Sequence, residues 1–142
     1  MKLLIANYRK KFSKIMENST KKSDLDNVVL FDLEYLQEIS DGDKEFSATM
    51  ITYFIENTPG VLENLKEKIQ GKDWEEVRQI AHKLKPQIVY MGIHAIENEV
   101  ELMEQNANKK QNLDQITPMF EKTEEICLKA IAQLKEELKK FE

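Results

Sequence analysis

The chain has 142 residues and a net charge of −5, with 41% hydrophobic and 33% charged residues. Its single cysteine, Cys127, excludes an internal disulfide framework and a cysteine-rich zinc site, and it fits a reducing cytoplasm. Four glycines and three prolines leave little material for the turns of an all-β fold. No apolar run reaches the roughly 18 residues of a membrane span, so we expect a cytoplasmic helical domain without stable membrane insertion.

The charge is distributed unevenly along the chain. Residues 1–22 carry seven Lys/Arg residues against Glu17 alone, a net charge of +6, which leaves −11 for residues 23–142. An acidic body argues against nucleic acid as a partner. Residues 1–22 have the pattern of a basic amphipathic helix, and the polar residues 19–27 resemble a linker. This extension is expected to pack on the domain or to lead flexibly into it, with membrane-surface contact or oligomerisation as alternatives.

Apolar residues recur at helical spacing through the remainder of the chain. The pattern predicts a short helix over residues 31–39 and long helices over residues 43–70, 74–91, 93–107 and 114–141. Since each apolar stripe must be buried against another, we expect residues 28–142 to form an all-α, antiparallel four-helix bundle. The short helix would cap one end, and residues 1–27 would form an N-terminal amphipathic extension. The stripe of the second helix is assigned to Phe46, Met50, Phe54, Val61, Leu65 and Ile69.

His82 lies on the wrong side of its helix to be part of the core. The apolar stripe of residues 74–91 consists of Trp74, Val77, Ala81, Leu84, Ile88 and Met91. At ~100° per residue, His82 points about 130° away from the centre of that stripe. The sequence therefore predicts an exposed imidazole in the middle of a helix, and an unperturbed imidazole with a pKa near ~6.5 is an available nucleophile at cytoplasmic pH.

Three local features distinguish His82 from an ordinary surface histidine. Arg78, Lys83 and Lys85 concentrate positive charge on and beside its face, where cations would attract a phosphoryl group. Pro86 and Val89 place apolar atoms beside the imidazole, which is typical of a surface that becomes covered. The third feature is a capped, striped helix that would hold the imidazole on a rigid element.

The residues present do not support a di-iron site, a nucleotide-binding loop or a serine or cysteine nucleophile. Neither His82 nor His94 has an acidic residue three positions before it, as the Glu-x-x-His pairs of di-iron bundles require. No glycine-rich phosphate-binding loop occurs, and no serine or cysteine nucleophile has a recognisable base. Cys127 is expected to be a buried filler, and His94 to be a surface residue without a role. No metal or cofactor is predicted for this chain.

The stretch I-A-H-K-L-K at residues 80–85, with Gly92 ten residues after the histidine, resembles the histidine-containing phosphotransfer (HPt) domain family. The resemblance extends back through D-L-E-Y-L and G-D-K-E-F, within residues 31–46, and covers roughly residues 31–140. It implies a monomeric bundle in which His82 accepts a phosphoryl group on Nε2 from a receiver-domain aspartyl phosphate and passes it to another receiver. Lys85 matches the family lysine that steadies the phosphoryl oxygens, and Lys83 matches a commonly basic neighbour.

The implied partners are response-regulator receiver domains and a hybrid sensor histidine kinase. Because no carboxylate cluster is expected near His82, the receiver would supply Mg²⁺. The chain would then be a carrier without autokinase activity, and its docking interface would be small and transient.

The sequence departs from the family pattern after Lys85. The family usually has glycine and then small residues there, whereas this chain has Pro86, Gln87 and Ile88. Proline is expected to bend or loosen the helix one turn after His82, which affects docking geometry. A helical adaptor that binds a receiver or kinase without phosphotransfer is therefore an alternative function, and a purely structural bundle is another.

Overall fold

A computed structural model describes residues 28–141, so the expected basic helix and linker, residues 1–27, lie outside the described part, as does Glu142. The described residues form five α-helices and three short 3-10 helices and contain no strand. The α-helices are α3 (Glu34–Ile39), α4 (Lys44–Gln70), α5 (Trp74–Tyr90), α6 (Glu97–Lys109) and α7 (Ile116–Leu138). The 3-10 helices are His94–Ile96, Leu113–Gln115 and Lys139–Phe141.

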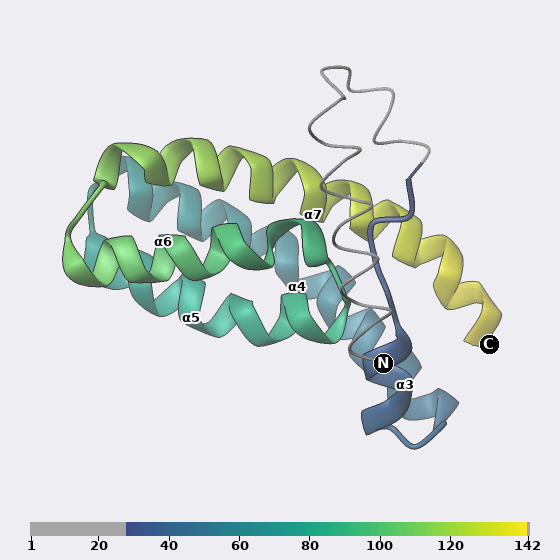
Figure 1. Ribbon diagram of the computed structural model, residues 1–142. Coiled ribbons are helices and arrows are strands. Elements are labelled where there is room, and N and C mark those ends of the chain that lie inside the picture. The colour runs from purple at the N-terminus through teal and green to yellow at the C-terminus, as the bar shows by residue number, and fades with distance from the viewer. Residues whose placement is uncertain (1–27, 142) are drawn as a thin grey trace.

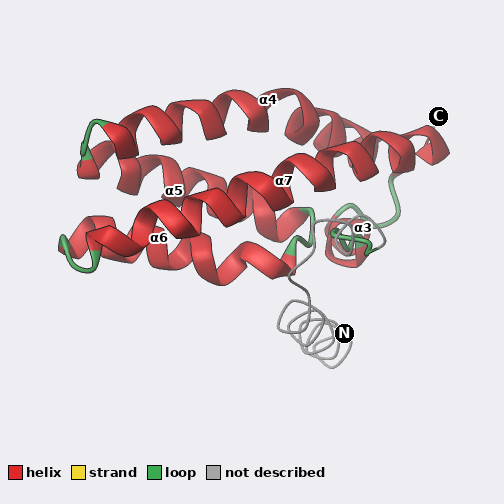
Figure 2. Cartoon of the chain, turned by 90° about the horizontal axis from the view of Figure 1, so that it is seen from above, coloured by secondary structure: helices red, strands yellow, loops and turns green. Residues whose placement is uncertain are grey.

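Helices α4 to α7 form the antiparallel four-helix bundle that the stripes predict (Figures 1 and 2). Each of these helices packs against its successor, and α7 closes the bundle against α4. The most extensive contact joins α5 and α6. Helix α3 lies at one end of the bundle, which confirms the expected capping helix (Figure 1). None of the helices in residues 28–141 combines the length and hydropathy that a membrane span requires.

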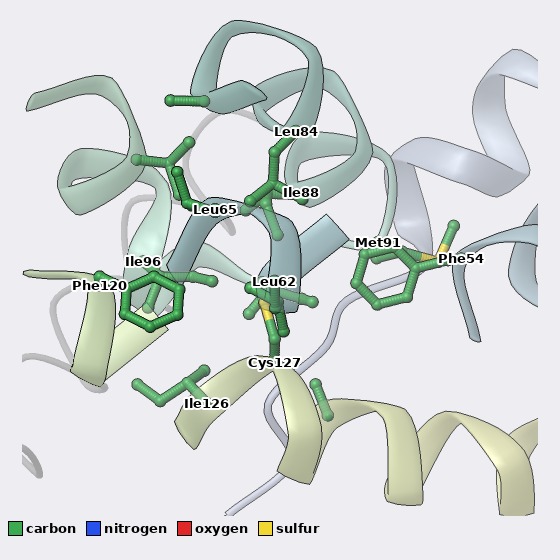
Figure 3. Close-up of a cluster of buried hydrophobic side chains, with 14 of the residues drawn as sticks. Phe54, Leu62, Leu65, Leu84, Ile88, Met91, Ile96, Phe120, Ile126 and Cys127 are labelled. Atoms are coloured by element: carbon green, nitrogen blue, oxygen red, sulfur yellow. The ribbon is translucent and has the colours of Figure 1, made fainter. Parts of the chain in front are cut away.

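The core is filled from all four long helices. Figure 3 shows Phe54 and Leu62 of α4, Ile88 of α5 and Cys127 of α7 pointing into the same interior. Burial raises the pKa of the Cys127 thiol to about 12, because a thiolate would be poorly solvated there. Cys127 is therefore a small packed side chain, as the sequence indicates.

The stripe of α5 is confirmed, but that of α4 is wrong at its start. Phe46, assigned to the core, is 44% exposed, while Ser47 and Ile51 are buried in its place. The Ser47 hydroxyl lies 3.1 Å from the Ser40 hydroxyl, so this turn of α4 faces the end of α3. Thr58 is also buried on the inner face, and a stripe read from apolar residues alone misses both hydroxyl side chains.

The connection between α5 and α6 is clamped onto the segment that precedes α3. The Asp32 amide donates to the Met91 carbonyl at 3.1 Å. Gly92 has a φ of +62°, and a Cβ at this position would lie 2.0 Å from the Asp32 carbonyl oxygen. Only glycine satisfies both the left-handed backbone and this close approach.

The expected exposure of His94 is wrong, because its side chain is only 6% exposed and belongs to the same clamp. His94 Nδ1 lies 2.9 Å from Glu97 Oε1, and Nε2 lies 3.4 Å from Asp32 Oδ2. The sequence places His94 near a helix start without showing that residues 28–33 fold over it. We refer to Asp32, Gly92, His94 and Glu97 as the turn clamp.

Candidate functional site

His82 lies on the exposed face of α5, with 67% of its side chain accessible. The Asp73 carboxylate accepts a hydrogen bond from the Glu76 amide at 3.3 Å and so caps the start of the helix. Val77, Ala81 and Leu84 are buried on the opposite side and fix the rotation of α5. The predicted outward orientation of His82 is what the structure has.

Glu104 of α6 binds one nitrogen of the imidazole. His82 Nδ1 lies 2.7 Å from Glu104 Oε1, and an ionised carboxylate can only accept a hydrogen bond. Nδ1 therefore carries the proton in this contact, and the lone pair of the neutral ring lies on Nε2. Within residues 28–141, Nε2 has no hydrogen-bond or ion-pair partner. The arrangement presents one nucleophilic nitrogen to solvent and fixes the ring through the other.

Lys85 makes a second contact between the same two helices. Its ammonium Nζ lies 3.5 Å from Glu101 Oε1, and both side chains are about half exposed. The pairs His82–Glu104 and Lys85–Glu101 are successive contacts between α5 and α6. Because the helices are antiparallel, moving three residues forward on α5 corresponds to moving three residues back on α6. The phosphoryl-binding lysine that the resemblance implies thus lies one turn from His82, but it is engaged by a carboxylate.

The other two predicted cations differ in their surroundings. Arg78 forms a bidentate pair with Glu75, at 2.6 Å and 3.1 Å, on its own helix. The hydrogen bond from Arg78, assisted by one from Gln79, lowers the pKa of the Glu75 carboxyl to about 2. Lys83 is exposed and has no ion-pair partner among the described residues. Lys83 is therefore the more available of these two charges.

Pro86 and Val89 are both exposed on the His82 side of α5, as predicted. Helix α5 continues through Pro86 as far as Tyr90. Proline has no amide hydrogen, so the carbonyl four residues earlier, that of His82, lacks its usual helical donor. Beyond these residues, Tyr90 stacks on Tyr35 of α3, with ring centroids 6.0 Å apart.

The sequence interpretation missed both α6 carboxylates, although a signal for them exists. Helices joined by a tight turn bring together residues equally distant from that turn, because both rise by the same ~1.5 Å per residue. Taking Ile93 as the centre, His82 and Glu104 are each eleven residues away, and Lys85 and Glu101 are each eight away. Residues 28–141 contain no group of three or more acidic, histidine or cysteine side chains placed to hold a metal ion.

The model of the Hpt domain family matches residues 49–142, which include His82, Lys85 and both α6 carboxylates. The chain therefore belongs to the Hpt domain family, whose members carry phosphoryl groups in two-component signalling. The D-L-E-Y-L and G-D-K-E-F elements lie before the matched residues. Comparisons with curated proteins and with solved structures give no match.

Proposed function

We propose that this chain is a phosphorelay carrier, in which His82 accepts a phosphoryl group from an aspartyl phosphate of one receiver domain and passes it to another. The observation that carries the proposal is the state of the imidazole. Glu104 holds Nδ1 at 2.7 Å, and the opposite nitrogen, Nε2, faces solvent on a rigid helix. Membership of the Hpt domain family supports the same reaction class.

In the proposed step, the Nε2 lone pair attacks the phosphorus atom of the aspartyl phosphate. The Nε2–P bond forms as the P–O bond to aspartate breaks, and the aspartate leaves as a carboxylate with that electron pair. The ring gains a positive charge while Nδ1 keeps its proton, and the Glu104 carboxylate neutralises that charge. In onward transfer the same Nδ1–H allows the ring to leave as a neutral imidazole.

Nearby cations would bind the transferred phosphoryl oxygens. Lys85 is one helical turn from His82, and Lys83 is adjacent and exposed. Arg78 is a weaker candidate because Glu75 already holds its guanidinium. Pro86 and Val89 would contact the receiver beside the imidazole.

We assign the remaining parts of the reaction to the partners. The receiver domain would bring Mg²⁺, and a hybrid sensor histidine kinase would be the original source of the phosphoryl group. The chain itself would act as a monomer without autokinase activity. We place this exchange in the cytoplasm, where a reduced Cys127 is expected. Residues 28–142 would be the carrier domain and residues 1–27 an extension to it.

The test is the intact mass of the chain after incubation with a phosphorylated receiver domain and Mg²⁺, read at neutral pH because phosphohistidine is acid-labile. Wild type should gain one phosphoryl group, and His82→Gln should gain none. His94→Gln is the matched control, because it removes the only other histidine and should keep the adduct. An adduct that persists in His82→Gln would refute the assignment.

The alternative function, an adaptor that binds receivers without accepting phosphate, is favoured by one feature. Pro86 stands where the family resemblance leads us to expect glycine, and its ring, exposed on the His82 side of α5, would limit how closely a receiver approaches the imidazole. If wild type binds several receivers in titration calorimetry yet acquires no phosphoryl group from any, the adaptor replaces the carrier. Pro86→Gly should then restore labelling if the proline ring is the obstacle.

A further inference from the structure

Lys85 is poised between two anionic partners, one present and one proposed. In the structure its ammonium is 3.5 Å from Glu101 Oε1, and the two side chains are 41% and 47% exposed. Charge pairs this exposed are weak enough to exchange partners readily. A phosphoryl group on His82, one turn away, carries more negative charge than a carboxylate and would compete for the same ammonium.

The α6 side of the site is already acidic. Glu104 contacts His82 Nδ1, and Glu101 forms an ion pair with Lys85. If Lys85 moves to the phosphoryl oxygens, the Glu101 carboxylate loses its only described ion-pair partner and remains near a newly arrived anion. Both effects raise the free energy of the phosphorylated form relative to the free imidazole.

We propose that Glu101 is a positioning residue that holds Lys85 away from Nε2 and thereby lowers the fraction of His82 that is phosphorylated at equilibrium. The inference rests on the proposed carrier function and deepens it. A carrier must release its phosphoryl group as readily as it accepts it. Glu101 provides that balance by competing with the phosphoryl group for Lys85, so the group passes on to the next receiver.

The experiment measures how one phosphoryl group partitions between this chain and a receiver domain. Phosphorylated chain is mixed with unphosphorylated receiver and Mg²⁺, and the ratio of phosphohistidine to phosphoaspartate is read at the plateau. Glu101→Gln should raise this ratio by about two- to fivefold, the range that a half-exposed ion pair supports.

The matched control is Glu125→Gln on α7. Glu125 is 43% exposed and lies 3.8 Å from Lys129 on the same helix, so this substitution removes the same charge from a carboxylate of similar exposure that is also paired with a lysine. It lies on a helix that packs against α4 and α6, away from the His82 face of α5. Its ratio should equal that of wild type.

A second background separates competition for Lys85 from simple repulsion. In Lys85→Gln, the additional Glu101→Gln substitution should change the ratio much less than in wild type, because only the repulsion between Glu101 and the phosphoryl group remains. An equal ratio in wild type and Glu101→Gln overturns the inference while leaving the carrier function intact. A change of the same size in both backgrounds also overturns it, since Glu101 would then act by its charge alone. Absence of label on wild type would remove the carrier function itself.

Discussion

The two histidines of this chain have opposite surroundings. His82 is 67% exposed and binds one carboxylate through Nδ1, whereas His94 is 6% exposed and has a carboxylate beside each ring nitrogen. The first arrangement orients a ring and leaves one nitrogen without a partner among the described residues. The second occupies both nitrogens and ties the α5–α6 turn to the segment before α3. The comparison teaches that the unoccupied nitrogen, and not the residue type or its helical position, distinguishes the proposed nucleophile from the structural histidine.

The largest effect is expected at the turn clamp, from Gly92→Ala. The new Cβ would lie 2.0 Å from the Asp32 carbonyl oxygen and overlap it. The φ of +62° would also strain any residue that has a side chain. We expect the free energy of unfolding in urea to fall by about 3 kcal/mol or more, from overlap and backbone strain together. The control Gly60→Ala, in open space on α4, should be neutral or stabilising. A Gly92→Ala protein of wild-type stability would contradict the clamp.

His94→Gln should have the next largest effect on stability and little effect on phosphotransfer. Glutamine cannot contact Asp32 and Glu97 together, so at least one of these largely buried carboxylates loses its contact with residue 94. The expected cost is about 2 kcal/mol of unfolding free energy. His82→Gln should lie within about 0.5 kcal/mol of wild type, because His82 is exposed. Equal effects of the two substitutions on the free energy of unfolding would contradict the distinction between a structural His94 and an exposed His82.

The sequence predicts one side of the His82 site and not the other. The α5 stripe fixes where His82, Lys83 and Lys85 point, because helical rotation depends only on spacing. Which α5 residues Glu104 and Glu101 contact depends on how α6 is aligned along α5. The turn between the two helices sets that alignment, and the apolar pattern of a single helix does not contain it. Counting residues outward from Ile93 along both helices pairs Glu104 with His82 and Glu101 with Lys85.

The errors have the same origin in long-range packing. His94 is enclosed because residues 28–33 cross the α5–α6 turn, a contact made across 62 positions of sequence. Phe46 is exposed because the buried face of α4 runs through Ser47 and Ile51, and Ser47 meets Ser40 at the end of α3. Apolar periodicity reports which residues prefer burial, whereas these two outcomes depend on which neighbour is available to bury them.

Glu104→Gln sharpens the comparison at His82, the proposed nucleophile. Glutamine can still accept a hydrogen bond from Nδ1, but it cannot neutralise the charge that the ring gains on phosphorylation. A hydrogen bond to a charged group contributes about 1.5–3 kcal/mol, and the exposed ring favours the lower end of that range, so we expect about a tenfold slower labelling of His82. The measurement is the initial rate with saturating phosphorylated receiver. Stability should be almost unchanged, and a rate equal to wild type would mean that Glu104 only orients the ring.

Cys127 provides a contrast from inside the bundle. Burial raises the pKa of its thiol to about 12, so almost no thiolate exists at pH 8 in the folded chain. Iodoacetamide at pH 8 should leave the folded protein unmodified for hours and alkylate it within minutes in denaturant, as read by intact mass. Rapid modification of the folded chain would show that α7 opens locally, which its fully packed position argues against.

The smallest effect on transfer is expected from Arg78→Ala, although Arg78 shares the His82 face. Glu75 holds the guanidinium at 2.6 Å, and the same contact keeps the pKa of the Glu75 carboxyl at about 2. The pair should therefore remain ionised until the pH falls toward 2, and in Arg78→Ala the Glu75 pKa should return toward its ordinary value, as a carbon-detected NMR titration would show. Labelling of His82 should change by less than about twofold, because an already paired, exposed cation contributes little. A larger loss would mean that Arg78 leaves Glu75 to bind the phosphoryl group, as we propose that Lys85 leaves Glu101.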